Sequence, residues 1–325
     1  MSPPALDRNR VAVLGAGRLG RAVVSLLKGA HISVYDRRPS ALEELAGSTD
    51  HPRLSTTTDI SEAMQGASLL YLAVPASSLA ELCTDLAPHG LPDQMVLLAS
   101  RGVTEGFQLP HQHVRNKTCL RQIGVFGGPL HVRELSAGRR LNAVIASRFH
   151  LVVEKVREVS AGAPVHFQVS RDVIGVQVAG AVGNVASIAA GMAEALELGD
   201  TARGVLLARG LLEARTLGVA IGAEAETFSG LAGVGELIPR AVRSMERHLD
   251  LGRALGRGLP LDAALAAVAG HVEGVTTAAE SVALARREEL SVPLLAGVQA
   301  ILHGEVEART QLEDILSLPL ELGSR

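Results

Sequence analysis

The sequence predicts an α/β protein of two domains, in which an N-terminal doubly wound parallel sheet precedes an all-helical C-terminal domain. Short strand-like and helix-like segments alternate through the first half of the chain, which is typical of a parallel sheet covered on both faces. A glycine-rich turn joins the first strand to the first helix. From about residue 171 long Ala/Leu/Val-rich stretches of helical period follow. We therefore expect domains at 8–170 and 171–325.

The individual elements follow from apolar runs bounded by glycine, proline and polar residues. Expected strands cover 11–14, 31–35, 67–74, 94–100, 121–126, 141–147 and 165–169. Expected helices between them cover 18–29, 39–46, 76–86 and 150–160. The second domain should contain helices at 172–197, 201–219, 241–256, 260–269, 274–289, 293–303 and 308–316. Ligands of parallel sheets bind at the carboxyl ends of the strands, so the loops after Val74, Ser100 and Phe126 should surround the reaction centre.

The turn after the first strand reads Gly15, Gly17 and Gly20, which is the spacing of a dinucleotide-binding Rossmann turn. The first glycine allows a sharp turn, the second allows close approach of a pyrophosphate, and the third allows tight helix–strand packing. An ordinary glycine turn is the alternative, but it leaves Asp36 at the end of the second strand unexplained. The expected cofactor-binding residues are Gly15, Gly17, Arg18, Leu19, Gly20, Asp36, Arg37, Val74 and Pro75.

The type of coenzyme is indicated by Asp36 and by the two arginines after it. A carboxylate at the end of the second strand accepts hydrogen bonds from the ribose hydroxyls and repels a 2′-phosphate, which favours NAD. Arg37 and Arg38 could instead hold the 2′-phosphate of NADP if Asp36 turned away. We therefore expect NAD as the cofactor and keep NADP as the alternative.

Composition narrows the class of protein. A formal net charge of −3 gives no indication of a nucleic-acid partner. The apolar runs are interrupted short of the ~20 residues that span a bilayer, and the N-terminus lacks the pattern of a secretory signal. Cys83 and Cys119 have no metal-type or redox-type spacing. We expect a cytoplasmic protein that binds neither nucleic acid nor membrane, with a homodimer permitted by the apolar helical faces.

The chain also resembles the NAD(P)-dependent glycerol-3-phosphate dehydrogenases, from Val11 to about Pro319. Beyond the glycine turn, ordered matches include Val-Pro at 74–75, Gly-Gly-Pro at 127–129 and Asp-Val-Ile-Gly at 172–175. Further matches are Gly-Ala-Val-Gly-Asn-Val at 180–185, Thr-Phe-Ser-Gly-Leu-Ala-Gly-Val-Gly-Glu-Leu at 227–237 and Val-Glu-Gly-Val-Thr-Thr at 272–277. The resemblance implies a small anionic substrate and hydride exchange between dihydroxyacetone phosphate and glycerol 3-phosphate.

The residues that align with the family's catalytic groups differ from the family pattern. The lysine that delivers a proton in the family aligns with Gly183, immediately before Asn184. A second active-site lysine aligns with Arg101, which keeps the positive charge but does not release its proton. The family's aspartate aligns with Glu236, and a threonine four residues later aligns with Arg240. The resemblance therefore implies a divergent member that lacks the catalytic lysine.

Substitute groups for proton transfer and phosphate binding are suggested by the same alignment. The family's phosphate-binding Arg-Asn pair aligns with Arg247 and His248. His131, after the Gly-Gly-Pro loop, and His248 are possible acid/base groups, since histidine titrates near neutral pH. Polar packing of these histidines is the alternative. The expected catalytic residues are Arg101, His131, Asn184 and Glu236, and the expected substrate-phosphate residues are Arg247 and His248.

Three interpretations stay open at this point. The first is a divergent dehydrogenase that protonates its substrate through His131, Glu236 or water. The second is a catalytically inactive homologue that binds dinucleotide and acts as a sensor or partner protein. The third is a dehydrogenase of a neighbouring hydroxyacid or hydroxyacyl class with the same domain layout.

Overall fold

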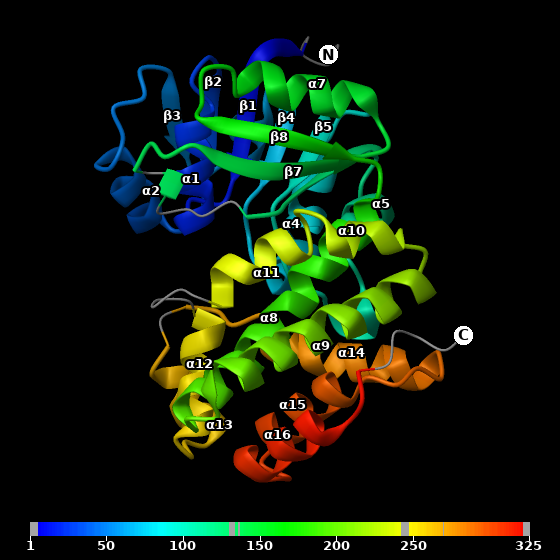
Figure 1. Cartoon of the computed structure of the whole chain (residues 1–325). Helices are drawn as coiled ribbons and strands as arrows, with labels where there is room; N and C mark the ends of the chain where they lie inside the picture. The colour runs from blue at the N-terminus through cyan, green and yellow to red at the C-terminus, as the bar shows by residue number, and fades with distance from the viewer. Residues whose placement is uncertain (1–5, 130–133, 136, 242–246, 269, 321–325) are drawn as a thin grey trace. The chain divides into compact units, whose positions relative to one another are not determined.

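The structure is a computed structural model that describes residues 6–129, 134–135, 137–241, 247–268 and 270–320. The chain divides into two compact units. The sheet unit comprises Met1–Ser100 and Pro110–Val173, and the helical unit comprises Arg101–Leu109 and Ile174–Arg325. In Figure 1 the sheet unit runs from blue to green and the helical unit mostly from green to red.

An eight-stranded sheet forms the centre of the sheet unit, in the order β3-β2-β1-β4-β5-β6-β7-β8. Its strands are β1 (Asp7–Leu14), β2 (His31–Tyr35), β3 (Leu54–Thr57), β4 (Ala67–Leu72), β5 (Met95–Leu98), β6 (Gln122–Gly127), β7 (Leu141–Ser147) and β8 (Val165–Ser170). All six residues of β4 are buried, as expected for a strand inside a parallel sheet. The strand order reverses between β1 and β4, so the predicted Rossmann fold is confirmed.

The helices and helical turns of the sheet unit lie between these strands. They are α1 (Arg18–Leu26), α2 (Pro39–Ala46), α3 (Ile60–Met64), α4 (Ala76–Leu86), η1 (Ala87–His89), α5 (Pro110–Lys117) and α7 (His150–Val159). Sequence periodicity missed β3, α3 and α5. Strand β3 and helix α3 have only four and five residues, and α5 is mostly polar, so each gives a weak periodic signal.

One departure from a purely parallel sheet occurs at its far edge. Strand β7 pairs antiparallel with β6 and parallel with β8, so the last two strands run against the other six. Mixed sheets with reversed edge strands are common among doubly wound folds. Because the reversal lies away from the junction of β1 and β4, it leaves the dinucleotide-binding end of the sheet unchanged.

The helical unit contains a short 3₁₀ turn and helices from α8 to the end of the described chain. They are η2 (Glu105–Phe107), α8 (Val173–Ala195), α9 (Gly199–Ala220), α10 (Ala225–Ser229), α11 (Val234–Ala241), α12 (Arg247–Gly256), α13 (Leu261–Ala266), α14 (Gly274–Arg287), α15 (Pro293–Leu302) and α16 (Ala308–Ser317). The all-helical character predicted for this part of the chain is confirmed. Within the helix expected at 241–256 the structure describes Ala241 and α12, whereas α10 and the rest of α11 were not expected from the sequence.

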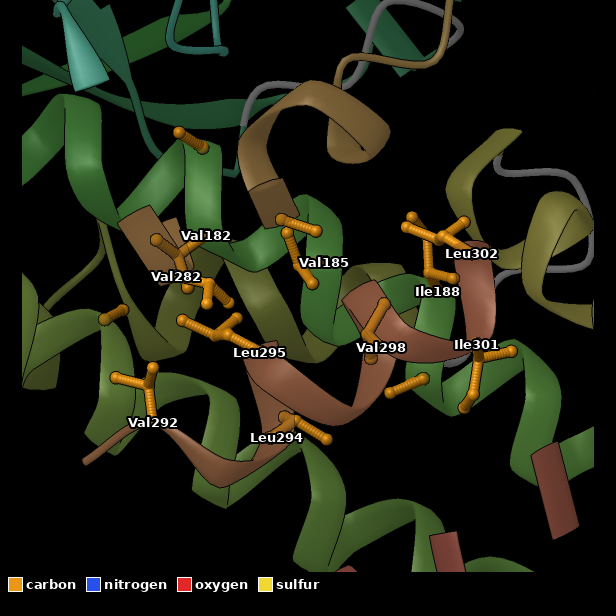
Figure 2. Close-up of a cluster of buried hydrophobic side chains, with 14 of the residues drawn as sticks. Val182, Val185, Ile188, Val282, Val292, Leu294, Leu295, Val298, Ile301 and Leu302 are labelled. Atoms are coloured by element: carbon orange, nitrogen blue, oxygen red, sulfur yellow. The ribbon is translucent and has the colours of Figure 1, made fainter. Parts of the chain in front are cut away.

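Helix α8 forms the middle of the helical unit's core. Figure 2 shows Val182, Val185 and Ile188 of α8 beside side chains of α15 and Val282 of α14. By length and composition alone α8 could cross a membrane, but 83% of its most apolar window is buried inside the fold. A helix that is apolar on all sides is expected where protein surrounds it, so burial accounts for the composition of α8.

Two glycines let α8 and α12 cross at backbone distance. A Cβ at Gly252 would lie 2.0 Å from the Ile188 oxygen, and one at Gly191 would lie 2.1 Å from the Leu249 oxygen. No larger residue fits at either position without moving one helix. This close crossing fixes the start of α12, which carries Arg247 and His248, relative to the middle of α8.

The boundary between the units differs from the sequence expectation in one segment. Residues 101–109 were expected in the first domain, but they group with the helices. The amide of Asn184 donates to the Arg101 carbonyl at 2.8 Å, and the Phe107 N–H donates to Glu280 at 3.1 Å. Phe107 and Leu109 also belong to the helical unit's apolar core. These contacts attach the segment to the helical unit although it directly follows strand β5.

Candidate functional site

A cavity of about 270 Å³ opens at the carboxyl ends of β1, β2 and β4 in the sheet unit. Its lining comprises Gly15, Gly17, Tyr35, Asp36, Arg37, Arg38, Ala73, Val74, Pro75, Ser78, Glu81, Leu82 and Asp85. The position is the point of strand-order reversal, where doubly wound sheets bind their ligands. Six of the predicted cofactor-binding residues line this cavity: Gly15, Gly17, Asp36, Arg37, Val74 and Pro75. The other three, Arg18, Leu19 and Gly20, lie in the first turn of α1.

Each of the three glycines in the turn is required for a different physical reason. Gly15 has φ +113°, and a Cβ there would lie 2.8 Å from the Ala73 oxygen. At Gly20 a Cβ would lie 1.8 Å from the Gly15 oxygen, so only glycine lets α1 start this close to the turn. A Cβ at Gly17 would meet no protein atom within 4 Å. Gly17 also caps α1, so it leaves open space at a helix N-terminus, where a phosphate is favoured.

Asp36 is bound to the glycine turn and to Arg38. Its Oδ2 accepts the Ala16 N–H at 2.9 Å, and its Oδ1 accepts the Arg38 N–H at 3.0 Å. Burial opposes ionisation of Asp36, but hydrogen bonds from the Arg38 side chain and from these two backbone groups outweigh it and lower its pKa. The carboxylate is therefore ionised at neutral pH and holds the turn in place.

A charged cluster lies within the helical unit. The Arg101 guanidinium forms an ion pair with Glu236, which is only 5% exposed, at the start of α11. Asn184 of α8 fixes the same segment by donating to the Arg101 carbonyl. At Gly180, one turn before Asn184, a Cβ would lie 3.9 Å from both the Arg101 Cγ and a Glu236 oxygen. Arg101, Asn184 and Glu236, which the resemblance had indicated, are thus neighbours.

The other site predictions have different outcomes. His248 is buried, and a Cβ at Gly274 would lie 2.9 Å from its Cδ2 and 3.4 Å from the backbone oxygen of Asn184, so the His248 ring and the backbone of Asn184 both lie around Gly274. Arg247 instead donates to the His271 carbonyl at 2.8 Å. His131 lies outside the described residues, and nothing is described of the Arg240 side chain. The catalytic and phosphate-binding roles of all these residues stay predictions.

The space beside Gly183 is small and contains no lysine. Gly183 and Glu236 line a cavity of about 10 Å³ together with residues of α9 and α11, which is close to the volume one water needs. Lys28 is exposed, and Lys117 is exposed and donates to the Thr84 hydroxyl. Lys155 is buried and donates to the Arg8 carbonyl. All three lysines of the chain belong to the sheet unit, and none lines the dinucleotide cavity.

Sequence reasoning missed the acidic side of the dinucleotide cavity and a second acid near Arg101. Glu81 and Asp85 of α4 line the cavity with Ser78, and Glu273 lies against Gly102. A signal for the first group was present, because Ser78, Glu81, Leu82 and Asp85 are spaced as one helix face. Glu273 gave no such signal, since it is far from Gly102 in the sequence.

Comparison with known proteins places these features in a family. The architecture and the glycine turn define the class of dinucleotide-binding proteins with a Rossmann sheet and a separate helical unit. Models of the NAD-dependent glycerol-3-phosphate dehydrogenase N-terminus and C-terminus match residues 10–150 and 172–313. The chain belongs to the NAD-dependent glycerol-3-phosphate dehydrogenase family and is an NAD(P)-dependent, glycerol-3-phosphate dehydrogenase-like oxidoreductase.

Individual relatives agree with this assignment over nearly their whole length. Glycerol-3-phosphate dehydrogenase [NAD(P)+] of Rhodospirillum rubrum is 33% identical over 97% of this chain and 94% of its own. The enzyme of the same name from Nocardia farcinica is 34% identical over 94% of this chain and 97% of its own. The crystal structure of glycerol-3-phosphate dehydrogenase from Coxiella burnetii matches with a TM-score of 0.89 at 26% identity, over 95% of this chain and 99% of that one.

More distant structures share the fold alone. A ketopantoate reductase from Ralstonia eutropha has a TM-score of 0.61 at 17% identity, over 93% of this chain and 99% of that one. The family models and the relatives above thus favour the glycerol-3-phosphate dehydrogenase family over a neighbouring hydroxyacid or hydroxyacyl class. Family membership and the Rossmann fold together support NAD(P) as the cofactor.

Proposed function

We propose that this protein transfers hydride between NAD(P)H and dihydroxyacetone phosphate or a related small anionic substrate. The observation that carries the proposal is the Arg101–Glu236–Asn184 cluster of the helical unit, together with a dinucleotide cavity in the sheet unit. When bound, the reduced coenzyme supplies the hydride for the substrate carbonyl carbon. The carbonyl oxygen then needs a proton, which completes the alcohol.

Arg101 has the role of an anion clamp in this proposal. Its guanidinium is permanently charged and can hold an oxyanion or phosphate, but it does not deliver a proton at the pH of proteins. Asn184 holds its backbone and Glu236 holds its side chain, so the charge is fixed in position before substrate arrives. His131, His248 and water are the remaining sources for the proton, because Gly183 has no side chain and the Glu236 carboxylate is paired with Arg101.

NAD is the proposed coenzyme, and Asp36 supports this choice. Its carboxylate is ionised, faces the cavity and is held by the glycine turn. A fixed carboxylate accepts hydrogen bonds from ribose hydroxyls and repels a 2′-phosphate. NADP stays the alternative, because Arg37 and Arg38 line the same cavity.

The second candidate function is an inactive homologue that binds dinucleotide and serves as a sensor or partner protein. It is favoured by the glycine at position 183, which has no side chain to carry a proton. Losing a positioned proton donor costs about 10²–10⁴ in rate, whereas coenzyme binding does not need that group. This candidate therefore predicts binding without turnover.

One pair of measurements separates the two functions. Purified protein is mixed with dihydroxyacetone phosphate and NADH or NADPH, absorbance is followed at saturating substrate, and coenzyme binding is measured by calorimetry. We expect substrate-dependent oxidation of the coenzyme. Coenzyme binding with no turnover would instead establish the inactive homologue.

Gly183→Lys tests whether the proton donor is the missing group. If it is, turnover should rise by about 100-fold or more, because a positioned acid contributes that factor. Gly204→Lys is the matched control, since Gly204 is an exposed glycine in α9 with open space around it. An equal change in both variants would show that the effect is unrelated to the site.

We further propose a cytoplasmic homodimer without nucleic-acid or membrane partners. The net charge of −3 supports the absence of a nucleic-acid partner. The apolar faces of the helices from residue 172 onward permit self-association. Light scattering after size-exclusion chromatography should give twice the chain mass, and a monomer mass would contradict this proposal.

A further inference from the structure

The two arginines that could bind a 2′-phosphate are both engaged by carboxylates in the dinucleotide cavity. Arg38 donates to both oxygens of Asp36, at 3.2 and 3.3 Å. Arg37 forms an ion pair with Glu81, with 3.3 Å between its NH1 and the Oε2 of Glu81. Each guanidinium that follows β2 is therefore already paired with an acid from the cavity lining.

Glu81 reaches Arg37 from a different element, helix α4. One face of α4 lines the cavity with Ser78, Glu81, Leu82 and Asp85. With Asp36, three carboxylates of the lining stand against the two guanidiniums of Arg37 and Arg38, so the lining carries a net negative formal charge at neutral pH.

The pKa of Tyr35, which also lines the cavity, is affected by this charge. Burial raises the pKa of Tyr35, and the carboxylates of Asp85 and Asp36 raise it further, which outweighs the opposite effect of Arg37. The electrostatic potential in this part of the cavity therefore disfavours a further negatively charged group.

We propose that Glu81 is a specificity-determining residue that makes the cavity select the coenzyme without a 2′-phosphate. Glu81 acts in two ways, since it holds Arg37 and adds a negative charge beside the ribose-binding Asp36. The inference rests on the proposed function, because it assumes that the cavity holds the adenosine half of NAD.

The exposure of the Arg37–Glu81 ion pair indicates what replacing Glu81 does to the fold and to coenzyme binding. The two side chains are 68% and 64% exposed, and exposed ion pairs contribute little to stability. Replacing Glu81 should therefore leave the fold intact, release Arg37 and remove one repelling charge. A phosphate carries nearly two negative charges at neutral pH, so it gains more from both changes than a ribose hydroxyl does.

The test is a double-mutant cycle read by calorimetric binding of NAD+ and NADP+ to the full-length protein. The variants are Glu81→Gln, Arg37→Gln and the two combined. Glu44→Gln is the matched control, because Glu44 is 65% exposed and pairs with Arg21 at 2.5 Å in the same unit but outside the cavity lining. Thermal unfolding by circular dichroism checks that each variant is folded.

We expect Glu81→Gln to tighten NADP+ binding about tenfold and to change NAD+ binding less than twofold. Arg37→Gln alone should have little effect, and the double variant should keep only the part of the NADP+ gain that comes from removing the charge of Glu81. Glu44→Gln should change neither constant.

Several results would overturn the inference and leave the proposed function intact. These are wild-type protein that binds both coenzymes equally, a gain that is undiminished in the double variant, or the same gain from Glu44→Gln. Failure of the wild type to bind either coenzyme would instead contradict the proposed function, so the two failures are distinguishable.

Discussion

Asp36 illustrates at the residue scale how one side chain combines a structural contact with a proposed role in coenzyme binding. It accepts the Ala16 N–H of the glycine turn, and its second oxygen accepts from Arg38. With the two bonds from the Arg38 side chain, its oxygens accept four hydrogen bonds, which is about the capacity of a carboxylate. A ribose hydroxyl would therefore have to replace the Arg38 side chain at Asp36. Because hydrogen bonds lower its pKa despite burial, its charge should persist throughout the neutral range.

Asp36→Asn should weaken NAD+ binding about tenfold, since it replaces charge-assisted hydrogen bonds by neutral ones. Because the folded-state pKa is lowered, this contribution is present above pH ~4 and is lost as pH falls further. Calorimetry at pH 6 and 8 measures the weaker binding of the variant, which should be the same at both pH values because both lie above this range. Asp59→Asn, at an exposed helix cap of the same unit, should bind NAD+ like the wild type, and equal losses would contradict the assignment.

At the scale of elements, a close helix crossing and helix caps donated by a distant part of the chain hold the helices of the helical unit together. Glycine makes the α8–α12 crossing possible, as shown by the 2.0 Å between a Cβ at Gly252 and the Ile188 oxygen. Helix α9 supplies caps for two other helices. Its Glu213 accepts the N–H groups of Leu294 and Leu295 at the start of α15, and its Arg209 donates to the Leu318 carbonyl beyond α16.

Gly252→Ala should lower the free energy of unfolding by about 3 kcal/mol, because a helix must move to admit the added carbon. Gly204→Ala is the control, since Gly204 lies in α9 with no atom near the added Cβ. The control should raise the free energy of unfolding by about 0.5–1 kcal/mol through helix propensity. Urea unfolding measures both values, and similar changes in the two variants would contradict the crossing.

Glu213 gives the helical unit a pH-dependent contribution to stability. Burial raises its pKa to about 7, although the two backbone N–H groups and Arg209 act in the opposite direction. The pKa of this carboxyl group is 4.5 in the unfolded chain and about 7 in the folded chain. Between pH 4.5 and about pH 7, the folded chain therefore binds more protons at Glu213 than the unfolded chain does. Its contribution is therefore present below the unfolded value and is lost as pH rises through 7.

The comparison of wild type with Glu213→Gln, which does not titrate, isolates this contribution. At each pH the free energy of unfolding of the variant is subtracted from that of the wild type. This difference should be about 2 kcal/mol larger at pH 5 than at pH 8. Urea unfolding at the two pH values measures it. Glu307→Gln should show the opposite sign, because hydrogen bonds from Thr310 lower the pKa of this exposed cap. A pH-independent difference at Glu213 would contradict the prediction.

At the scale of the whole molecule, the cavity proposed for the coenzyme and the charged cluster belong to different units. The dinucleotide cavity is lined by sheet-unit residues, and Arg101, Asn184 and Glu236 lie in the helical unit. Each unit also has its own apolar core. Binding of the coenzyme and turnover of the substrate should therefore respond to different substitutions.

Glu236→Gln should lower kcat by at least about 100-fold and leave NAD+ affinity within twofold of the wild type. The variant loses the charge that holds Arg101, so the anion clamp loses its fixed position. Steady-state kinetics and calorimetry give the two numbers. Glu226→Gln, an exposed glutamate of α10, should change neither, and a parallel loss of affinity and turnover at Glu236 would contradict the separation.

The sequence by itself determined the Rossmann sheet, the glycine turn with Asp36 and the helical second half. These signals are local, since strand and helix periods and the glycine spacing act within about 25 residues. The neighbours Arg101, Asn184 and Glu236 were reached only through the family resemblance, because no local pattern joins them. Tertiary structure alone decided that 101–109 joins the helices, that Glu81 faces Arg37, and that Glu213 caps α15 from 81 residues away. Such contacts depend on how whole elements pack, and packing is specified by the complete set of buried surfaces rather than by any single segment.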